Sequence, residues 1–252
     1  MKKLYILLFL GIITFCAQGQ SEEYVFRNPQ DSSFNCYLKV YPYTQEIKGI
    51  IIRDYSKLPD TSQKSPYRFL KLASEQGFMT IYTVTSPVFP ELYYDDSGPA
   101  LLDEILHEVI SDHQLQNRPV FIGGISASGT RALRYAQYCA EGKSQYGHSI
   151  NGVFAADPPL DLERFYRSAA RIMQRKLEGS MLEEAALMLK VLPEQLGGTL
   201  DEKLWAYQEA SVYSYFHPTG GNAQYFSEVP LLIYHEPDME CYTFWEMKML
   251  PS

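Results

Sequence analysis

The sequence lacks the features that characterise several classes of protein. It has four cysteines in 252 residues, and no pair of cysteines or histidines has a zinc-ligand spacing, so no metal site is predicted. It has no basic excess: 22 lysines and arginines against 30 aspartates and glutamates give a net charge of −8. Such a charge repels phosphates and disfavours nucleic-acid binding. No internal repeat is present, and no cofactor is implied.

Long apolar runs are also scarce. Two lysines precede a short apolar run at residues 4–16, and small residues follow at the spacing that signal peptidase reads. The run is shorter than the roughly 20 residues that span a bilayer. We therefore expect residues 1–19 to be a secretory signal peptide, cleaved before Gln20, and the product to be secreted or periplasmic without stable membrane insertion. Cys16 leaves a lipoprotein as the second interpretation.

The mature chain, residues 20–252, has the length of one domain with a well-buried core. An odd number of cysteines would remain after cleavage, so a complete disulfide framework cannot form and at most one bridge is possible. Those cysteines are Cys36, Cys139 and Cys241.

Strand-like and helix-like segments alternate along most of this chain. Two extended segments flank a turn at residues 28–33 and predict an antiparallel hairpin. Apolar runs typical of doubly buried strands then alternate with segments of helical periodicity, which predicts crossover connections and a mainly parallel, doubly wound α/β sheet. The expected strands are Tyr24–Arg27, Asn35–Tyr41, Lys48–Arg53, Met79–Thr85, Pro119–Gly123, Ile150–Ala155 and Pro230–Tyr234, and the expected helices between them are Pro66–Gln76, Pro99–His113 and Thr130–Ala140.

A long interruption, at about residues 160–226, separates the last two strands. It is too long for a single crossover and predicts a helical insertion. The insertion is either a lid or ordinary packing on the sheet. Its candidate helices are Leu162–Leu177, Met181–Val191 and Leu200–Val212.

The segment Gly124-Ile125-Ser126-Ala127-Ser128-Gly129 carries the clearest chemical signal. It follows a predicted strand and precedes a predicted helix, which is the context of a nucleophile elbow. Such a turn needs small residues two positions before and after the nucleophile, here Gly124 and Ser128. Ser128 is the rival nucleophile, but Thr130 stands where it would need a small residue. We therefore predict that Ser126 is the nucleophile.

This motif, the strand order around it and the helical insertion resemble the α/β-hydrolase superfamily, over most of the mature chain. The resemblance implies an oxyanion hole formed by the amide of Ala127 and a second amide from the loop after the third strand. Asp54 and Tyr55 occupy that loop, and Tyr55 is our choice for the second donor. The loop lacks the glycines found in other members, and both residues could equally be ordinary strand-end polar residues.

The same resemblance implies a catalytic acid after the strand that follows the insertion. Asp238 fits that position best, and its neighbour Glu236 is an alternative. Asp157, at the end of the preceding strand, occupies the other position that the family uses. Each of the three could also be only a solvated carboxylate at a strand end.

The resemblance fails at the base, because the family's histidine follows the acid in the chain and no histidine follows Asp238. Three of the five histidines lie on the helix before the elbow or at the far side of the sheet: His107, His113 and His148. His235, at the catalytic end of its strand, and His217, in the insertion, are the only candidates for a substitute base.

We therefore hypothesise that the chain is a shortened form of a longer hydrolase that has lost a last strand and a histidine loop. The segment Tyr242–Trp245 would be the start of a helix leading to that strand, which would otherwise cover an apolar sheet edge. Activity would then be impaired.

Two functions follow from these expectations. The first is a serine hydrolase that cleaves an ester or amide of a small molecule or peptide through an acyl-enzyme. The second is a non-catalytic binding protein that keeps the fold. The 20 tyrosines and 13 phenylalanines suggest an apolar or aromatic pocket, although aromatic residues are mostly core material.

Overall fold

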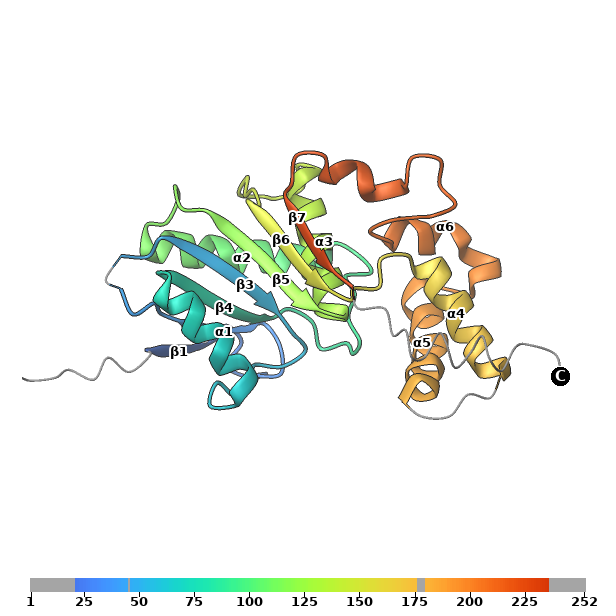
Figure 1. The fold of residues 1–252 in the computed structure, drawn as a ribbon, viewed down its shortest axis with the longest axis horizontal. Helices are drawn as coiled ribbons and strands as arrows, with labels where there is room; N and C mark the ends of the chain where they lie inside the picture. The colour runs from blue at the N-terminus through green and yellow to red at the C-terminus, as the bar shows by residue number, and fades with distance from the viewer. Residues whose placement is uncertain (1–20, 45, 176–179, 236–252) are drawn as a thin grey trace, which may run out of the picture.

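The computed structural model describes residues 21–44, 46–175 and 180–235, and in this part of the chain a seven-stranded sheet runs through the middle of the protein (Figure 1). The strand order is β1-β2-β4-β3-β5-β6-β7. Strands β3 to β7 run parallel, and β2 pairs antiparallel with both β1 and β4. The predicted α/β class is confirmed. The strands are β1 (Glu22–Phe26), β2 (Cys36–Val40), β3 (Gly49–Asp54), β4 (Phe78–Val84), β5 (Val120–Ile125), β6 (Gly152–Ala156) and β7 (Leu231–Tyr234).

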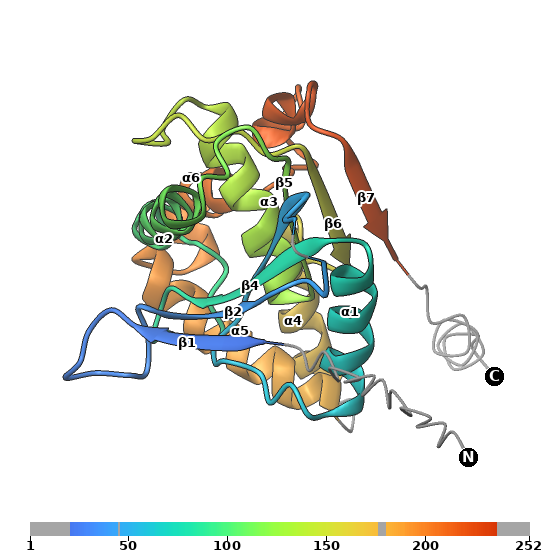
Figure 2. The ribbon, with the colours of Figure 1, turned by 90° about the vertical axis from the view of Figure 1, so that its left-hand side faces the viewer.

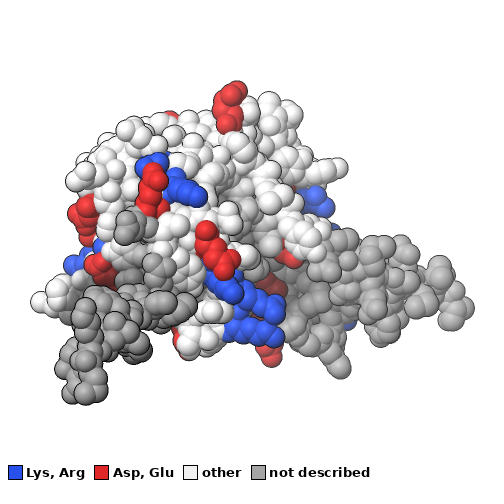
Figure 3. All heavy atoms as spheres, turned by 60° about the vertical axis from the view of Figure 1, so that its left-hand side comes forward, with Lys and Arg blue, Asp and Glu red and all other residues white. Residues whose placement is uncertain are grey.

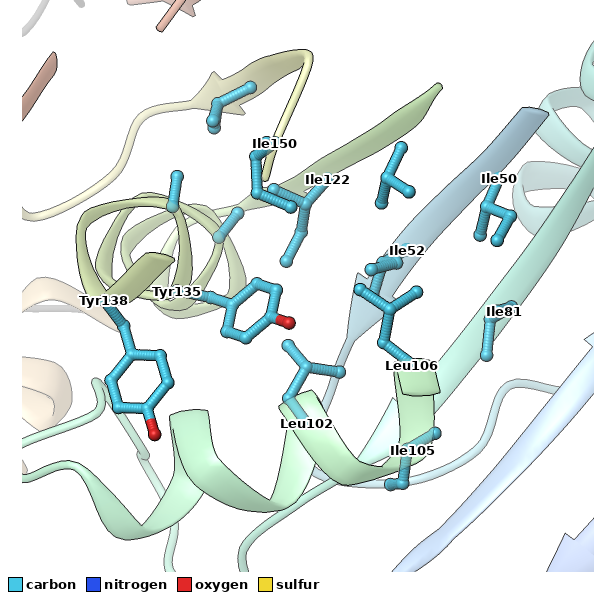
Figure 4. Close-up of a cluster of buried hydrophobic side chains, with 14 of the residues drawn as sticks. Ile50, Ile52, Ile81, Leu102, Ile105, Leu106, Ile122, Tyr135, Tyr138 and Ile150 are labelled. Carbon is cyan, nitrogen blue, oxygen red and sulfur yellow. The ribbon is translucent and has the colours of Figure 1, made fainter. Parts of the chain in front are cut away.

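Helices cover both faces of the sheet. Helix α1 (Lys64–Glu75) lies on one face, and α2 (Ser97–His113) and α3 (Ala127–Ala140) lie on the other (Figure 2). Because successive side chains of a strand point to opposite faces, Ile50 and Ile52 of β3 pack in the same buried cluster as α2 and α3. The small cluster on the opposite face centres on Leu70 of α1. Figure 4 shows the larger cluster between the sheet and these two helices.

The predicted insertion contains three helices: α4 (Leu162–Arg175), α5 (Ser180–Leu196) and α6 (Leu200–Ala210). They lie beyond the carboxyl ends of the parallel strands rather than on a face of the sheet (Figure 1). They share a second buried cluster, which the loop after β4 joins through Leu92. This position favours the lid interpretation. A short 3₁₀ helix (Gly221–Phe226) leads from the insertion to β7.

Helix α5 continues past its predicted end at Val191. Pro193 lies inside it, although proline removes a helical hydrogen bond. Leu192 is completely buried and Met188 nearly so, and burying each such side chain contributes about 1.5–3 kcal/mol. Packing therefore holds the last turn of α5 despite the proline.

Strand β7 forms one edge of the sheet within the described residues (Figure 2), and all four of its residues are exposed. The sequence predicts this apolar edge. The segments that would bear on what covers it, or on processing of the chain, lie outside the described residues: the predicted signal peptide at residues 1–19, Glu236, Asp238 and Tyr242–Trp245.

The surface offers no extended basic area on the face shown in Figure 3, where acidic and basic side chains are interspersed. None of the helices in the described ranges combines the length and apolarity that crossing a membrane requires. Both cysteines in those ranges, Cys36 and Cys139, are free thiols.

Candidate active site

Ser126 occupies the turn between β5 and α3. Its φ of 54° and ψ of −129° place a non-glycine residue in a left-handed conformation, which costs of order 1–3 kcal/mol and persists mainly at functional sites. Its backbone N–H donates to the carbonyl of Ala156 on the next strand at 2.8 Å, and its side chain is exposed. The turn therefore has the geometry that the motif predicts.

The small residues around Ser126 allow strand and helix to approach. A Cβ added to Gly124 would lie 2.4 Å from the carbonyl carbon of Ser128, and one added to Gly129 would lie 3.2 Å from the carbonyl oxygen of Gly124. The side chain of Ser128 is buried, and its hydroxyl donates to the carbonyl of Asp54. Ser128 thus fixes the helix to β3, and only Ser126 of the two serines presents its hydroxyl to solvent.

A cavity of about 560 Å³ opens beside Ser126, within the range of small-molecule sites. Its walls come from the ends of β3 and β5, the loop after β4, the first turns of α3, and the insertion helices α4 and α5. Most of the lining is apolar. The lining residues are Tyr55, Ser56, Phe89, Pro90, Leu92, Ile125, Ser126, Ala127, Ser128, Arg131, Pro159, Phe165, Glu183, Glu184, Leu187 and Met188.

The two predicted oxyanion donors, Ala127 and Tyr55, differ in whether their amides already have a hydrogen-bond acceptor. Ala127 is the first residue of α3 and lines the cavity, and amides in the first turn of a helix have no intrahelical acceptor. The amide of Tyr55 donates to the carbonyl of Thr83 at 2.9 Å, so it is committed to the sheet and the prediction for Tyr55 is wrong. Ser56, one residue further, also lines the cavity. Its amide has no hydrogen bond within the described residues.

A buried ion pair that the sequence analysis missed lies at the floor of the cavity. Arg131 Nη1 is 3.1 Å from Asp54 Oδ2, and both side chains are at most 2% exposed. Asp54 also accepts hydrogen bonds from the hydroxyls of Thr83, Thr85 and Tyr93. The pair therefore joins helix α3 to the end of β3, beside the loop in which the second oxyanion amide is predicted. The signal that could have found it is a carboxylate two residues after the apolar run Ile50–Ile52, still within the strand.

Burial raises the pKa of two side chains near this pair, in the loop after β4. The carboxyl of Glu91 accepts hydrogen bonds from Ser86 Oγ at 2.9 Å and the amide of Tyr93 at 2.6 Å. Burial raises the pKa of Glu91 above its usual value. Burial, and then the charge of Asp54, raise the pKa of Tyr93 far above its usual value. Tyr93 is thus a neutral hydrogen-bond donor to Asp54 at all physiological pH values.

The structure brings together two of the predicted residues, Asp157 and His235. Asp157 Oδ1 lies 2.6 Å from His235 Nδ1. They follow β6 and β7 directly, and the register pairs Ala156 with Tyr234 as it pairs Ile125 with Ala156. Ser126, Asp157 and His235 therefore stand at the same level on the ends of three neighbouring strands. The side chains of His235 and Asp157 are 70% and 47% exposed.

His217 lies elsewhere. Its Nδ1 accepts a hydrogen bond from the amide of Gly221 at 3.2 Å and lies 3.1 Å from the hydroxyl of Thr219, within its own loop. Neither His217 nor the pair of Asp157 and His235 lines the cavity, but the ring of His217 is in addition held within its own loop, away from the strand ends, so the structure gives no support to His217 as a base. The two other acids, Asp238 and Glu236, lie outside the described residues.

The remaining histidines have structural environments. His107 stacks on Tyr146 with ring centroids 3.8 Å apart, and His113 meets the ring of Tyr41 edge-on at 5.6 Å. Burial lowers the pKa of His113 and of His148. None of the three lines the cavity. Within the described ranges, no group of three or more histidine, cysteine or acidic side chains is placed to hold a metal ion.

No protein-family model and no curated protein sequence matches the chain. Solved structures do. An acylaminoacyl peptidase from Pyrococcus horikoshii is 10% identical with a TM-score of 0.54, over 96% of this chain and 37% of that one. The match with an S-formylglutathione hydrolase from Agrobacterium tumefaciens has 13% sequence identity and a TM-score of 0.48, over 93% of this chain and 97% of that one. The match with esterase B from Lactobacillus rhamnosis has 15% identity and a TM-score of 0.49, over 86% of this chain and 75% of that one.

At these sequence identities the similarity concerns the fold. Of these three matches, the one with the peptidase has a TM-score high enough to support a common fold. It agrees with three observations made on the chain itself: the strand order, the elbow at Ser126, and the helical insertion before β7. The chain therefore has the fold of the α/β-hydrolase superfamily.

Proposed function

We propose that this protein is a serine hydrolase that cleaves carboxylic esters through an acyl-enzyme on Ser126. One observation carries the proposal: an exposed serine is held in a strained turn at the mouth of an apolar cavity, on the first turn of a helix. A serine hydroxyl is a poor nucleophile and needs this exposure, a neighbouring base and amides for the developing oxyanion.

We assign the base to His235 and its orientation to Asp157. The Asp157 carboxylate accepts from Nδ1, which leaves Nε2 free to take the serine proton. Neighbouring strands lie about 4.8 Å apart, so the ends of β5 and β7 are separated by roughly 10 Å. A seryl and an imidazole side chain that turn toward each other span this distance. The aspartate stands between them on β6, at the alternative acid position of the fold.

In the first half-reaction, Ser126 Oγ forms a bond to the substrate carbonyl carbon while its proton moves to His235 Nε2. The amides of Ala127 and Ser56 donate to the oxyanion. The tetrahedral intermediate then expels the alcohol, which takes the proton from His235. In the second half, water gives a proton to His235 and attacks the acyl group, and the acid is released as Ser126 recovers its proton.

A fluorophosphonate probe and p-nitrophenyl butyrate test the proposal on the folded protein. We expect labelling of Ser126 and ester hydrolysis, with both lost in Ser126→Ala and kept in Ser168→Ala, a change in α4 away from the cavity. His235→Asn should lower kcat by about 10⁶-fold and Asp157→Asn by about 10⁴-fold. His217→Asn is the matched control and should leave kcat unchanged.

The exposure of His235 favours one alternative, a binding protein that has kept the fold without catalysis. That alternative predicts no labelling of Ser126 in the folded protein. Hydrolysis that survives His235→Asn would instead assign the base to another residue.

A further inference from the structure

Among the described residues, the charge of the cavity beside Ser126 is not balanced. Glu183 and Glu184 line it from the start of α5, a helix that lies beyond the carboxyl ends of the strands (Figure 1). Both are exposed, and neither makes an ion pair or hydrogen bond with another described residue. The residues three and four positions further along the helix are Ala186, Leu187 and Met188, so α5 offers them no basic partner there.

The cavity's own cation does not offset these two carboxylates. Arg131 is 2% exposed, and its charge is matched by Asp54 at 3.1 Å. Aromatic rings complete the walls, namely Phe89, which is 67% exposed, Tyr55 and Phe165. Aromatic faces and carboxylates both attract a positive charge, and an aromatic wall is the usual means of recognising a quaternary ammonium group.

We infer that the ester cleaved at this site carries a cationic ammonium group, which lies between the carboxylates of α5 and the aromatic wall. The inference rests on the proposed function of Ser126 and narrows its substrate class. Binding such a group would relieve the repulsion between two adjacent like charges. A positive helix dipole at the start of α5 also favours acidic residues there, and this structural explanation predicts no preference among substrates.

Two pairs of esters, matched in shape and different in charge, separate these explanations in the full chain. Butyrylcholine and 3,3-dimethylbutyl butyrate place the charge on the alcohol. The p-nitrophenyl esters of Nα-benzyloxycarbonyl-lysine and Nα-benzyloxycarbonyl-norleucine place it on the acyl group. We expect kcat/KM to be about 10-fold higher for the charged member of at least one pair. The preference should shrink as salt rises, since salt screens exposed charges.

The double variant Glu183→Gln, Glu184→Gln should reduce this ratio to about one, and the ratio within each matched pair, rather than kcat/KM for either ester, is the quantity compared. Glu194→Gln removes a charge from the same helix outside the cavity and should leave the ratio as it is. Equal kcat/KM within both pairs, or a preference that survives the double variant, overturns the inference while the proposed function stands. Absence of any ester hydrolysis together with absence of Ser126 labelling overturns both.

Discussion

The strained turn at Ser126 makes a prediction about stability that is independent of activity. At its φ of 54° a Cβ costs of order 1–3 kcal/mol, which glycine avoids. Glycine in turn loses about 0.5–1 kcal/mol relative to alanine through the freedom of the unfolded chain. Ser126→Gly should therefore be more stable than Ser126→Ala by about 0.5–2 kcal/mol, the difference of these two effects.

The matched pair Ser168→Gly and Ser168→Ala lies inside α4, where glycine is the less favourable residue by about 1 kcal/mol. Replacing alanine by glycine should thus stabilise the protein at position 126 and destabilise it at position 168. Urea and thermal unfolding measure all four variants, and at about 2–4 °C per kcal/mol for a chain of this size the Ser126 pair should differ by roughly 1–8 °C in Tm. If glycine destabilises position 126 as it does position 168, the turn is not strained and the elbow geometry is wrong.

Three further predictions concern the surroundings of the site. Arg131→Met should lower the free energy of unfolding by about 3–5 kcal/mol because it leaves Asp54 buried without its counter-charge, and adding Asp54→Asn should recover part of this loss in urea unfolding. Burial raises the pKa of Glu91, so the folded state favours its protonated form. The free energy of unfolding of the wild type, relative to that of Glu91→Gln, should therefore fall as pH rises from about 4.5 through the raised pKa. A difference between the two proteins that does not change with pH would contradict this. Gly124→Ala should cost about 1–3 kcal/mol through overpacking and abolish Ser126 labelling, whereas Gly142→Ala, where a Cβ meets no atom within 4 Å, should keep the labelling.

The sequence predicts those parts of the structure that depend on local pattern. The elbow could be read from Gly124, Ser126 and Ser128 because a tight turn constrains residue size within a few positions. The mainly parallel sheet followed from alternating strands and helices, since such an alternation needs crossover connections. The end of α5 was missed because packing around Leu192 overrides the local effect of Pro193.

The role of Tyr55 could not be predicted in this way. Whether its amide faces the cavity or the neighbouring strand depends on where β3 stops pairing with β4, and Asp54 still pairs with Thr83. A shift of one residue reverses which backbone group is free. In the proposed function the second oxyanion amide is therefore that of Ser56, in the same loop.

The apparent absence of a base in the sequence analysis follows from taking Asp238 as the acid. Chain order places the histidine after the acid, and the printed sequence shows none after Asp238, whereas His235 follows Asp157. The sheet instead sets which residues are neighbours, and its register brings the ends of β5, β6 and β7 to one level. With Asp157 as the proposed acid, the chain order is Ser126, Asp157, His235, so the histidine still follows the acid, but on the strand next to it. Asp157 and His235 are in hydrogen-bond contact at that level, and the proposed function therefore takes its base from β7; loss of hydrolysis in His235→Asn with retention in His217→Asn would support that assignment.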